Sequence, residues 1–411
     1  MLFGLECRKI FRSAAFWIYC VLSVVFFATN YFGSYGGPLY DGVEGYKMTE
    51  DHDLVMSGAT DMLFGEYASN KYVCYPFGFY KAVHLKESDQ KRIADYLMEI
   101  TGTDEKGFEG LLGQGTEYYV MAGFQEQLEY MYEDMPVAEG FSYDRFTEIM
   151  TDVDNLLGGG SEYDPEKLLY YYGQVPMTEE ECQAEHEAFI KDDRITGGFA
   201  RLFSDYAGID LAILPVFPAA FLTAADRKRR MHELVYTRNV SSCKLVFTRY
   251  AALVFTMFIP VFFEMIAALI QAMIQYKGQD LDMGIMFTLP TFWLLPILMC
   301  TTAAGVLITE IFSAVTAIFA QVVIWFLTVM MSSNMLVGQI GKFTLVCRHN
   351  SAGERAAFLA TQDNFIFSRF FWAAVSLVII AAAAAVYEAK REGRFNGFKL
   401  FGEGGLLRRQ A

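Results

Sequence analysis

Long uncharged stretches alternate with polar segments along this chain. Residues 14–32 (AAFWIYCVLSVVFFATNYF) carry no charge and are just long enough to cross the bilayer core as a helix. Residues 203–223 and 251–275 predict a second and a third span, and Pro215 and Pro218 are expected to kink the second. The pattern is typical of a multi-pass membrane protein.

Two further spans are expected within residues 285–333, because Glu310 is the only charged residue of this stretch. We place the tight turn between them near residues 302–311. A loop at residues 332–368 follows, and residues 370–386 form the sixth span.

The segment between the first two spans, residues 33–197, has a different pattern. Apolar residues recur at helical spacing from Ser88, which could cap the helix, to Gly102, which would end it. Similar patterns predict helices over roughly 116–134, 143–157 and 178–195. The predicted fold is an all-α integral membrane protein of six transmembrane helices, with a mostly helical extracytoplasmic domain between the first and the second.

Charge divides the chain in the same way as hydropathy does. Residues 33–197 hold 34 acids and 11 bases, whereas the rest of the chain holds 14 acids and 22 bases. Sixteen Lys and Arg flank the spans on one side of the predicted membrane, and the two short loops on the other side hold five. Cytoplasmic flanks of membrane spans are enriched in Lys and Arg. We therefore expect both termini on the cytoplasmic side of a bacterial plasma membrane, with residues 33–197 outside. An acidic domain of this kind argues against nucleic acid as a partner.

The start of the chain has two interpretations. Arg8, Lys9 and Arg12 precede the first apolar stretch, as in a secretory signal peptide. We favour an uncleaved span, because no small-x-small cleavage site follows and Tyr31 and Phe32 are typical of an interfacial anchor.

Seven cysteines are present and no C-x-x-C pair occurs among them. Neither a zinc site nor a redox motif is therefore indicated. Cys74 and Cys182 could form a disulfide if the acidic segment is external, and buried free thiols are the alternative.

The sequence also lacks the common catalytic motifs. It contains no G-x-x-x-x-G-K-[ST], no H-E-x-x-H and no G-x-S-x-G. We expect no catalytic residue, no bound metal and no directly bound cofactor. Any ATP-driven work, with its ATP and magnesium, would therefore need a separate partner subunit.

Glu264 is the most informative charge in the predicted spans, because it lies near the middle of the third. A carboxylate there is costly and usually faces protein or water, so Glu264 could line a translocation path or a subunit contact. A protonated or hydrogen-bonded structural role is the alternative. Asp205, Asp210 and Glu310 are expected at the membrane interface, where water solvates them.

A basic run follows the second span, at residues 226–238 (DRKRRMHELVYTR). It could act only as a topology signal and an anchor for anionic lipid. Met231, Leu234 and Val235 add an apolar stripe, which favours a short helix that docks on a cytoplasmic partner. The residues expected at this docking site are Arg227, Lys228, Arg229, Arg230, Met231, Glu233, Leu234 and Arg238.

The order of these elements resembles the permease subunits of type-2 ABC exporters. Three patches carry the resemblance: ECRKIFR at residues 6–12, the stretch from residue 208 to Lys244 that includes the basic run, and YEAKREG at residues 387–393. It covers the membrane part, about half of the chain, through diffuse patterns.

The resemblance implies a domain organisation and partners. It implies a cytoplasmic interface helix (1–13), a first span (14–32), an external domain (33–197), a second span (203–223), a coupling segment (224–250), four further spans (251–386) with an external re-entrant hairpin at 332–368, and a cytoplasmic tail (387–411). The implied partners are a separate ABC ATPase subunit, a second permease copy or a related permease, and membrane lipid.

We therefore predict a transport subunit that does no covalent chemistry itself. A membrane receptor or sensor with an external ligand-binding domain is the alternative, although the longest internal piece, about 25 residues, leaves little room for a signalling module. A membrane-embedded transferase would need clustered His, Asp or Glu, whereas the predicted spans hold isolated acids. The substrate and the direction of transport do not follow from the sequence.

Overall fold

The computed structural model describes residues 2–32, 46–49, 51–76, 80–122, 125–228, 240–333, 340–349 and 351–395. It divides into two compact units. The membrane unit comprises Met1–Gly42 and Gln183–Ala411, and the polar unit comprises Val43–Cys182. Helix α8 (Glu179–Lys191) contains the point where the chain passes from the polar unit to the membrane unit.

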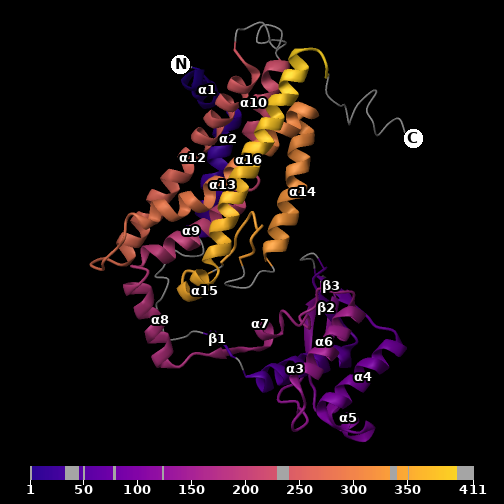
Figure 1. The fold of residues 1–411 in the computed structure, drawn as a ribbon. Helices are drawn as coiled ribbons and strands as arrows, with labels where there is room; N and C mark the ends of the chain where they lie inside the picture. The colour runs from indigo at the N-terminus through magenta and orange to yellow at the C-terminus, as the bar shows by residue number, and fades with distance from the viewer. Residues whose placement is uncertain are drawn as a thin grey trace. The chain divides into compact units, whose positions relative to one another are not determined.

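The membrane unit is a bundle of long helices (Figure 1). Five helical stretches of the described residues are long and apolar enough to cross a membrane, which indicates a multi-pass membrane protein. Its helices are α1 (Leu2–Phe11), α2 (Ala14–Phe27) with the π-helical turn η1 (Ala28–Phe32), α9 (Thr196–Leu211), α10 (Val216–Lys228), α12 (Ser242–Gln275), α13 (Ile285–Ile311), α14 (Ala314–Ser333), α15 (Arg355–Ala360) and α16 (Gln362–Arg391).

Two details of the predicted spans differ in the structure. The turn between the fourth and the fifth apolar stretch lies at residues 312–313, because residues 302–311 continue α13 and bury Thr302, Ala303 and Glu310. Helix α14 corresponds to the predicted fifth span, but its described apolar part, Ala314–Val329, is shorter than the other five apolar helices. The predicted second span is not one continuous helix. Helix α9 ends at Leu211 and α10 begins at Val216, where the prolines interrupt the helix.

The polar unit combines helices with three two-stranded antiparallel sheets. Its helices are α3 (His52–Ser69), α4 (Glu87–Thr101), α5 (Glu105–Leu112), α6 (Tyr143–Leu157) and α7 (Leu168–Tyr172). The paired strands are β1 (Tyr46–Met48) with β6 (Gln174–Pro176), β2 (Tyr72–Cys74) with β3 (Lys81–Val83), and β4 (Thr116–Ala122) with β5 (Gln125–Met131). Its core lies between α3, α4 and α6, where Leu63, Phe64, Ile93, Leu97 and Phe146 are fully buried.

One predicted helix of the polar unit is wrong. Residues 116–131 form the β4–β5 hairpin, in which Thr116 pairs with Met131 and Tyr119 with Leu128. Tyr118, Tyr119 and Val120 favour extended backbone, and this preference prevails over the helical spacing of the apolar residues. The fold is therefore mostly helical rather than all-α.

The other predicted helices of the polar unit are confirmed, with one changed start. Helix α4 begins after Lys86 instead of Ser88. It ends at Gly102, whose φ of 67° glycine adopts without strain. Helix α6 follows the predicted bounds, and α8 ends at Lys191. Cys74 and Cys182 are both free thiols.

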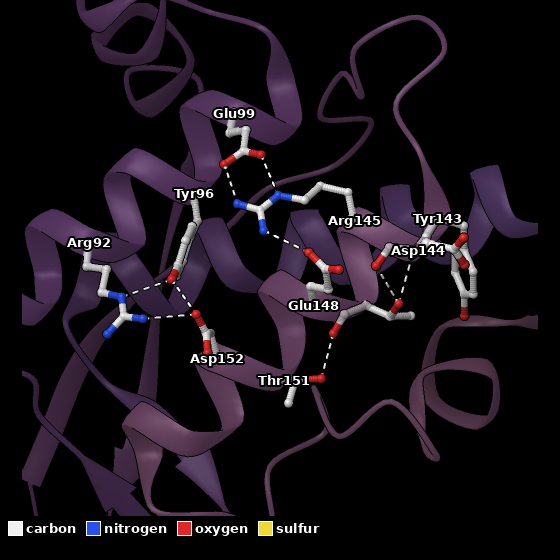
Figure 2. A network of polar contacts seen from close by, with 10 residues as sticks. Arg92, Tyr96, Glu99, Tyr143, Asp144, Arg145, Glu148, Thr151 and Asp152 are labelled. Atoms are coloured by element: carbon white, nitrogen blue, oxygen red, sulfur yellow. Dashed lines mark hydrogen bonds and ion pairs between the residues drawn. The ribbon is translucent and has the colours of Figure 1, made fainter.

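Ion pairs connect α4 and α6 across the surface of the polar unit (Figure 2). The Arg145 guanidinium donates to both carboxylate oxygens of Glu99, at 2.7 and 3.0 Å, and to Glu148 at 3.0 Å. Arg92 donates to Asp152 at 2.9 Å. These side chains are exposed, so water competes with every pair.

Candidate functional site

Three polar side chains from different helices meet inside the membrane unit. The Ser23 hydroxyl of α2 lies 2.8 Å from Asp210 Oδ2 of α9 and 3.0 Å from Glu264 Oε1 of α12. Ser23 is 1% exposed, and Asp210 and Glu264 are 5% exposed each, so all three are removed from water. A hydroxyl carries one proton, and it therefore donates to only one of the two carboxyls at a time. We call these residues the carboxyl pair and its serine.

Local packing fixes the serine toward the carboxyl pair. Tyr19 precedes Ser23 by one helical turn and lies on the same face of α2. Its hydroxyl donates to the Met257 carbonyl of α12 at 2.7 Å, and its ring is buried. Helix α9 is buried over almost its whole length, and Asp210 near its end contacts Ser23. The site therefore depends on the contact of α2 with both α9 and α12.

The electrostatics of the carboxyl pair differ from those of an ordinary buried ion pair. Within the described part of the chain, neither Asp210 nor Glu264 forms an ion pair with a base. A charge in a membrane interior is costly, and two adjacent carboxylates also repel each other. A proton or another positive group at this place would therefore stabilise the carboxyl pair, and no base among the described residues supplies one.

An apolar groove of about 500 Å³ on the surface of α2 and α12 reaches Glu264, one member of the carboxyl pair. Glu264 is the one charged residue among those that line it. The remaining lining is apolar or small: Phe11, Phe16, Trp17, Cys20, Val24, Phe27, Ala28, Phe32, Ile259, Pro260, Phe263 and Ala267. A molecule that entered this groove from the lipid side would meet a single carboxyl.

Three acids that we expected in water are buried instead. Asp205 accepts a hydrogen bond from Arg348 at 2.7 Å, and Glu310 accepts one from Lys390 at 3.0 Å. Asp210 belongs to the carboxyl pair. Their positions near predicted span ends made solvation the natural expectation, but contacts with distant segments enclose all three. An acid within a predicted span was the signal that could have identified Asp210.

A buried base that forms no ion pair within the described residues holds the loop that precedes α15. Arg369 of α16 is 1% exposed and donates to the carbonyls of Trp293 at 3.0 Å, Thr344 at 2.6 Å and Leu345 at 2.9 Å. The guanidinium holds its N–H donors in a fixed planar arrangement. Arg369 of α16 therefore connects residues 340–349 to α13 and α16. Among the described residues of the expected hairpin at 332–368, α15 is the one helix that lies wholly between α14 and α16.

The same loop is also connected to the start of α9. Arg201 donates to both oxygens of Asp193, and to the carbonyls of Ala352 at 2.7 Å and Gly353 at 3.2 Å. The Arg201 and Asp193 side chains are 3% and 5% exposed, respectively. Removing one partner of such a buried pair is strongly destabilising. This end of the bundle is therefore rigidly connected.

A separate helix precedes the first span, within the residues 1–13 for which the resemblance implies an interface helix. Helix α1 ends at Phe11, and Ser13 caps α2 by accepting from the Phe16 amide at 3.2 Å. Glu6 of α1 accepts from Arg249 of α12 at 3.2 Å. Helix α1 therefore packs against α12, close to the start of α12.

The predicted docking residues cannot be compared with the structure as a group. Helix α10 reaches Lys228, and its described side chains end before Arg227. Residues 229–239, which include Arg229, Arg230, Met231, Glu233, Leu234 and Arg238, lie outside the described residues. Docking by this segment stays a prediction.

Comparisons with known proteins give no relative. No protein-family model matches the chain, and neither a curated protein nor a solved structure matches it. Among the described residues, no three His, Cys, Asp or Glu side chains are grouped so as to hold a metal ion. The class that the structure supports is that of a multi-pass membrane protein.

Proposed function

We propose that the chain is the permease subunit of an ATP-driven exporter that works with a separate ATPase subunit. The observation that carries the proposal is the carboxyl pair, Asp210 and Glu264, inside a multi-pass bundle and beside an apolar groove. Ionisable groups in such a place are expensive and commonly mark the path of a substrate or an ion. The resemblance of the membrane part to type-2 exporters gives the class of transporter.

The connections of the carboxyl pair support a mechanism for coupling to ATP. Residues 229–239 join α10 to α12, and α12 carries Glu264. Helix α10 follows α9, which carries Asp210, after a short turn. A partner that moved residues 226–240 would therefore move the helices of both carboxyls relative to α2.

The apolar groove indicates the side from which a substrate would enter. Its lining is apolar except for Glu264, so an amphipathic molecule could leave the lipid phase and keep its hydrophobic part in contact with protein. A change in the contact of Ser23 with the two carboxyls would alter their capacity to accept a positive group. ATP hydrolysis itself would take place in the partner subunit.

Co-purification tests this proposal. The tagged chain is extracted in mild detergent from its natural host, and the eluate is assayed for ATP hydrolysis and for a subunit with a P-loop. We expect a vanadate-sensitive ATPase to accompany the wild-type chain and to be lost with the triple variant Arg227→Glu, Arg229→Glu and Arg230→Glu. The matched control reverses three exposed bases of the polar unit, Lys86, Lys91 and Lys106, and should retain the partner.

Two results would contradict the proposal. Normal recovery of the ATPase with the triple variant would remove the docking role of the basic run. A wild-type chain that purifies alone or with a kinase would favour the receptor alternative, and the basic run would then be a lipid anchor.

A further inference from the structure

The polar unit contains a cavity of about 390 Å³ between α3, the β4–β5 hairpin and α7. Its volume lies in the range of sites for small molecules. The hairpin approaches α3 very closely at Gly65, where a Cβ atom would lie 2.5 Å from the Tyr130 carbonyl oxygen. A glycine is therefore required there to bring the hairpin over the cavity.

Tyrosines form much of the cavity wall. Tyr118 and Tyr130 come from the hairpin, Tyr132 follows it, and Tyr171 and Tyr172 belong to α7. Aromatic rings attract a cation through their negative faces, most strongly where water is excluded. Five tyrosines around one cavity therefore favour a positively charged occupant.

Carboxyls line the same cavity in excess over bases. Asp61, Glu66, Glu129 and Glu162 contribute to the wall, and Lys71 is the one base among its lining residues. The Lys71 ammonium is bonded to Glu129, which also accepts from the Tyr118 hydroxyl at 3.0 Å. Three carboxyls remain without an ion pair in the described part of the chain.

Burial has a measurable effect on these three carboxyls. It raises the pKa of Glu66 to about 7, although the Tyr163 hydroxyl and the Val73 amide, both at 2.7 Å, favour the ionised form. Burial also raises the pKa values of Asp61 and Glu162. Asp61 and Glu66 have no base beside them within the described residues, and Lys167 is the positive charge that acts on Glu162. A bound cation would stabilise the ionised forms of all three carboxyls.

We propose that this cavity binds a small organic cation with a guanidinium or an ammonium group. The positive group lies among the carboxyls and the tyrosine rings, and the apolar part contacts Met62 and the ring edges. The high negative charge of residues 33–197 draws cations toward this unit before they bind. This cation site does not rest on the proposed transport function, because either a permease or a receptor could contain it.

Calorimetric titration of the full chain in detergent tests the site. The probe is N-acetyl-arginine amide, and N-acetyl-citrulline amide is its neutral isostere. Salt at about 0.15 M screens attraction by distant charges. We expect the arginine probe to bind with a Kd below about 1 mM, and the citrulline probe to bind at least tenfold more weakly.

Three variants separate this site from a general attraction of cations. Glu162→Gln should weaken binding of the arginine probe at least fivefold, whereas Glu105→Gln on the exposed face of α5 removes the same charge and should change it less than twofold. Lys71→Met should tighten binding about threefold, because it releases Glu129. A gain of affinity of this kind does not arise from misfolding.

The proposal fails on any of three outcomes. Equal binding of the two probes would show that charge is not recognised. An equal loss with Glu105→Gln would show that the attraction is general, and weaker binding with Lys71→Met would show that the cavity does not hold the probe. None of these outcomes bears on co-purification with an ATPase.

Discussion

Carboxyls are held in opposite ways on the α4–α6 surface and inside the membrane unit. On the surface, Glu99 accepts two hydrogen bonds from Arg145, which lower the pKa of Glu99 (Figure 2). Inside the membrane unit, Asp210 and Glu264 share the single hydroxyl of Ser23. The surface acids have both water and arginine as partners, whereas the buried pair has neither within the described residues.

The exposed carboxyls and the buried carboxyl pair therefore have different consequences for the protein. Exposed ion pairs contribute little to stability, because water and salt screen them. A buried carboxyl without a base costs stability, and such groups commonly mark functional sites. Under the proposed function the carboxyl pair serves transport, and the variants below are ordered by the size of the effect that we expect on stability.

The largest loss of stability is expected for Arg369→Met, which removes a buried base instead of a buried acid. The carbonyls of Trp293, Thr344 and Leu345 would lose their donor, at a cost of about 1 to 3 kcal/mol each. The variant should elute largely as aggregate in size-exclusion chromatography. Arg355→Met is the matched control, because Arg355 is 40% exposed and its partner Asp193 keeps Arg201. Similar elution of both variants would contradict this account.

An intermediate effect is expected for Glu66→Gln, and it depends on pH. The pKa of Glu66 is raised in the folded chain to about 7, above its ordinary value of 4.5. The stability that the protonated carboxyl contributes is therefore complete below about pH 4.5 and is lost as the pH rises through 7. The loss amounts to at most about 3.5 kcal/mol, at about 1.4 kcal/mol per pKa unit.

Pulse proteolysis of the full chain at pH 5 and pH 8 measures this effect. Glutamine resembles the protonated carboxyl, so Glu66→Gln should resist cleavage in the polar unit better than the wild type at pH 8 and equally at pH 5. Asp61 and Glu162 have raised pKa values too, so part of the pH dependence should remain. An unchanged difference between the two pH values would exclude Glu66 as its source.

The smallest effect is expected for Arg145→Ala in the surface network. Its three hydrogen bonds to Glu99 and Glu148 are exposed to water, so the loss of stability should be smaller than for either variant above. Pulse proteolysis of the polar unit at pH 7 checks this order. A loss as large as that of Arg369→Met would show that the surface network is structural, and the comparison with the carboxyl pair would no longer hold.

The sequence predicts the elements of this protein better than their contacts. Uncharged stretches gave the long helices, because burial in lipid requires them to be apolar along their length. The sequence also identified Glu264 as a candidate, since a charge within such a stretch is rare. Asp210 and Ser23 lie 54 and 241 residues away from it in the chain, and the rotation of each helix about its axis depends on packing. No spacing rule for one sequence gives that rotation.

The errors have similar physical causes. The β4–β5 hairpin was expected as a helix, because its apolar residues also fit a helical period, and strand preference decided the outcome. Asp205 and Glu310 were expected in water, because their bases Arg348 and Lys390 belong to segments far along the chain. Long-range ion pairs of this kind leave no local pattern.

The double variant Asp210→Asn and Glu264→Gln tests the central claim most directly. The wild-type and variant chains are compared, each with its co-purified ATPase, for ATP turnover in lipid nanodiscs and for melting temperature. We predict a loss of turnover of at least tenfold with an equal or higher melting temperature, because neutral side chains cost less inside the bundle. Glu310→Gln, which leaves Lys390 without its carboxylate, should instead lower the melting temperature. Wild-type turnover together with a lowered melting temperature in the double variant would contradict the claim and assign the carboxyl pair a structural role.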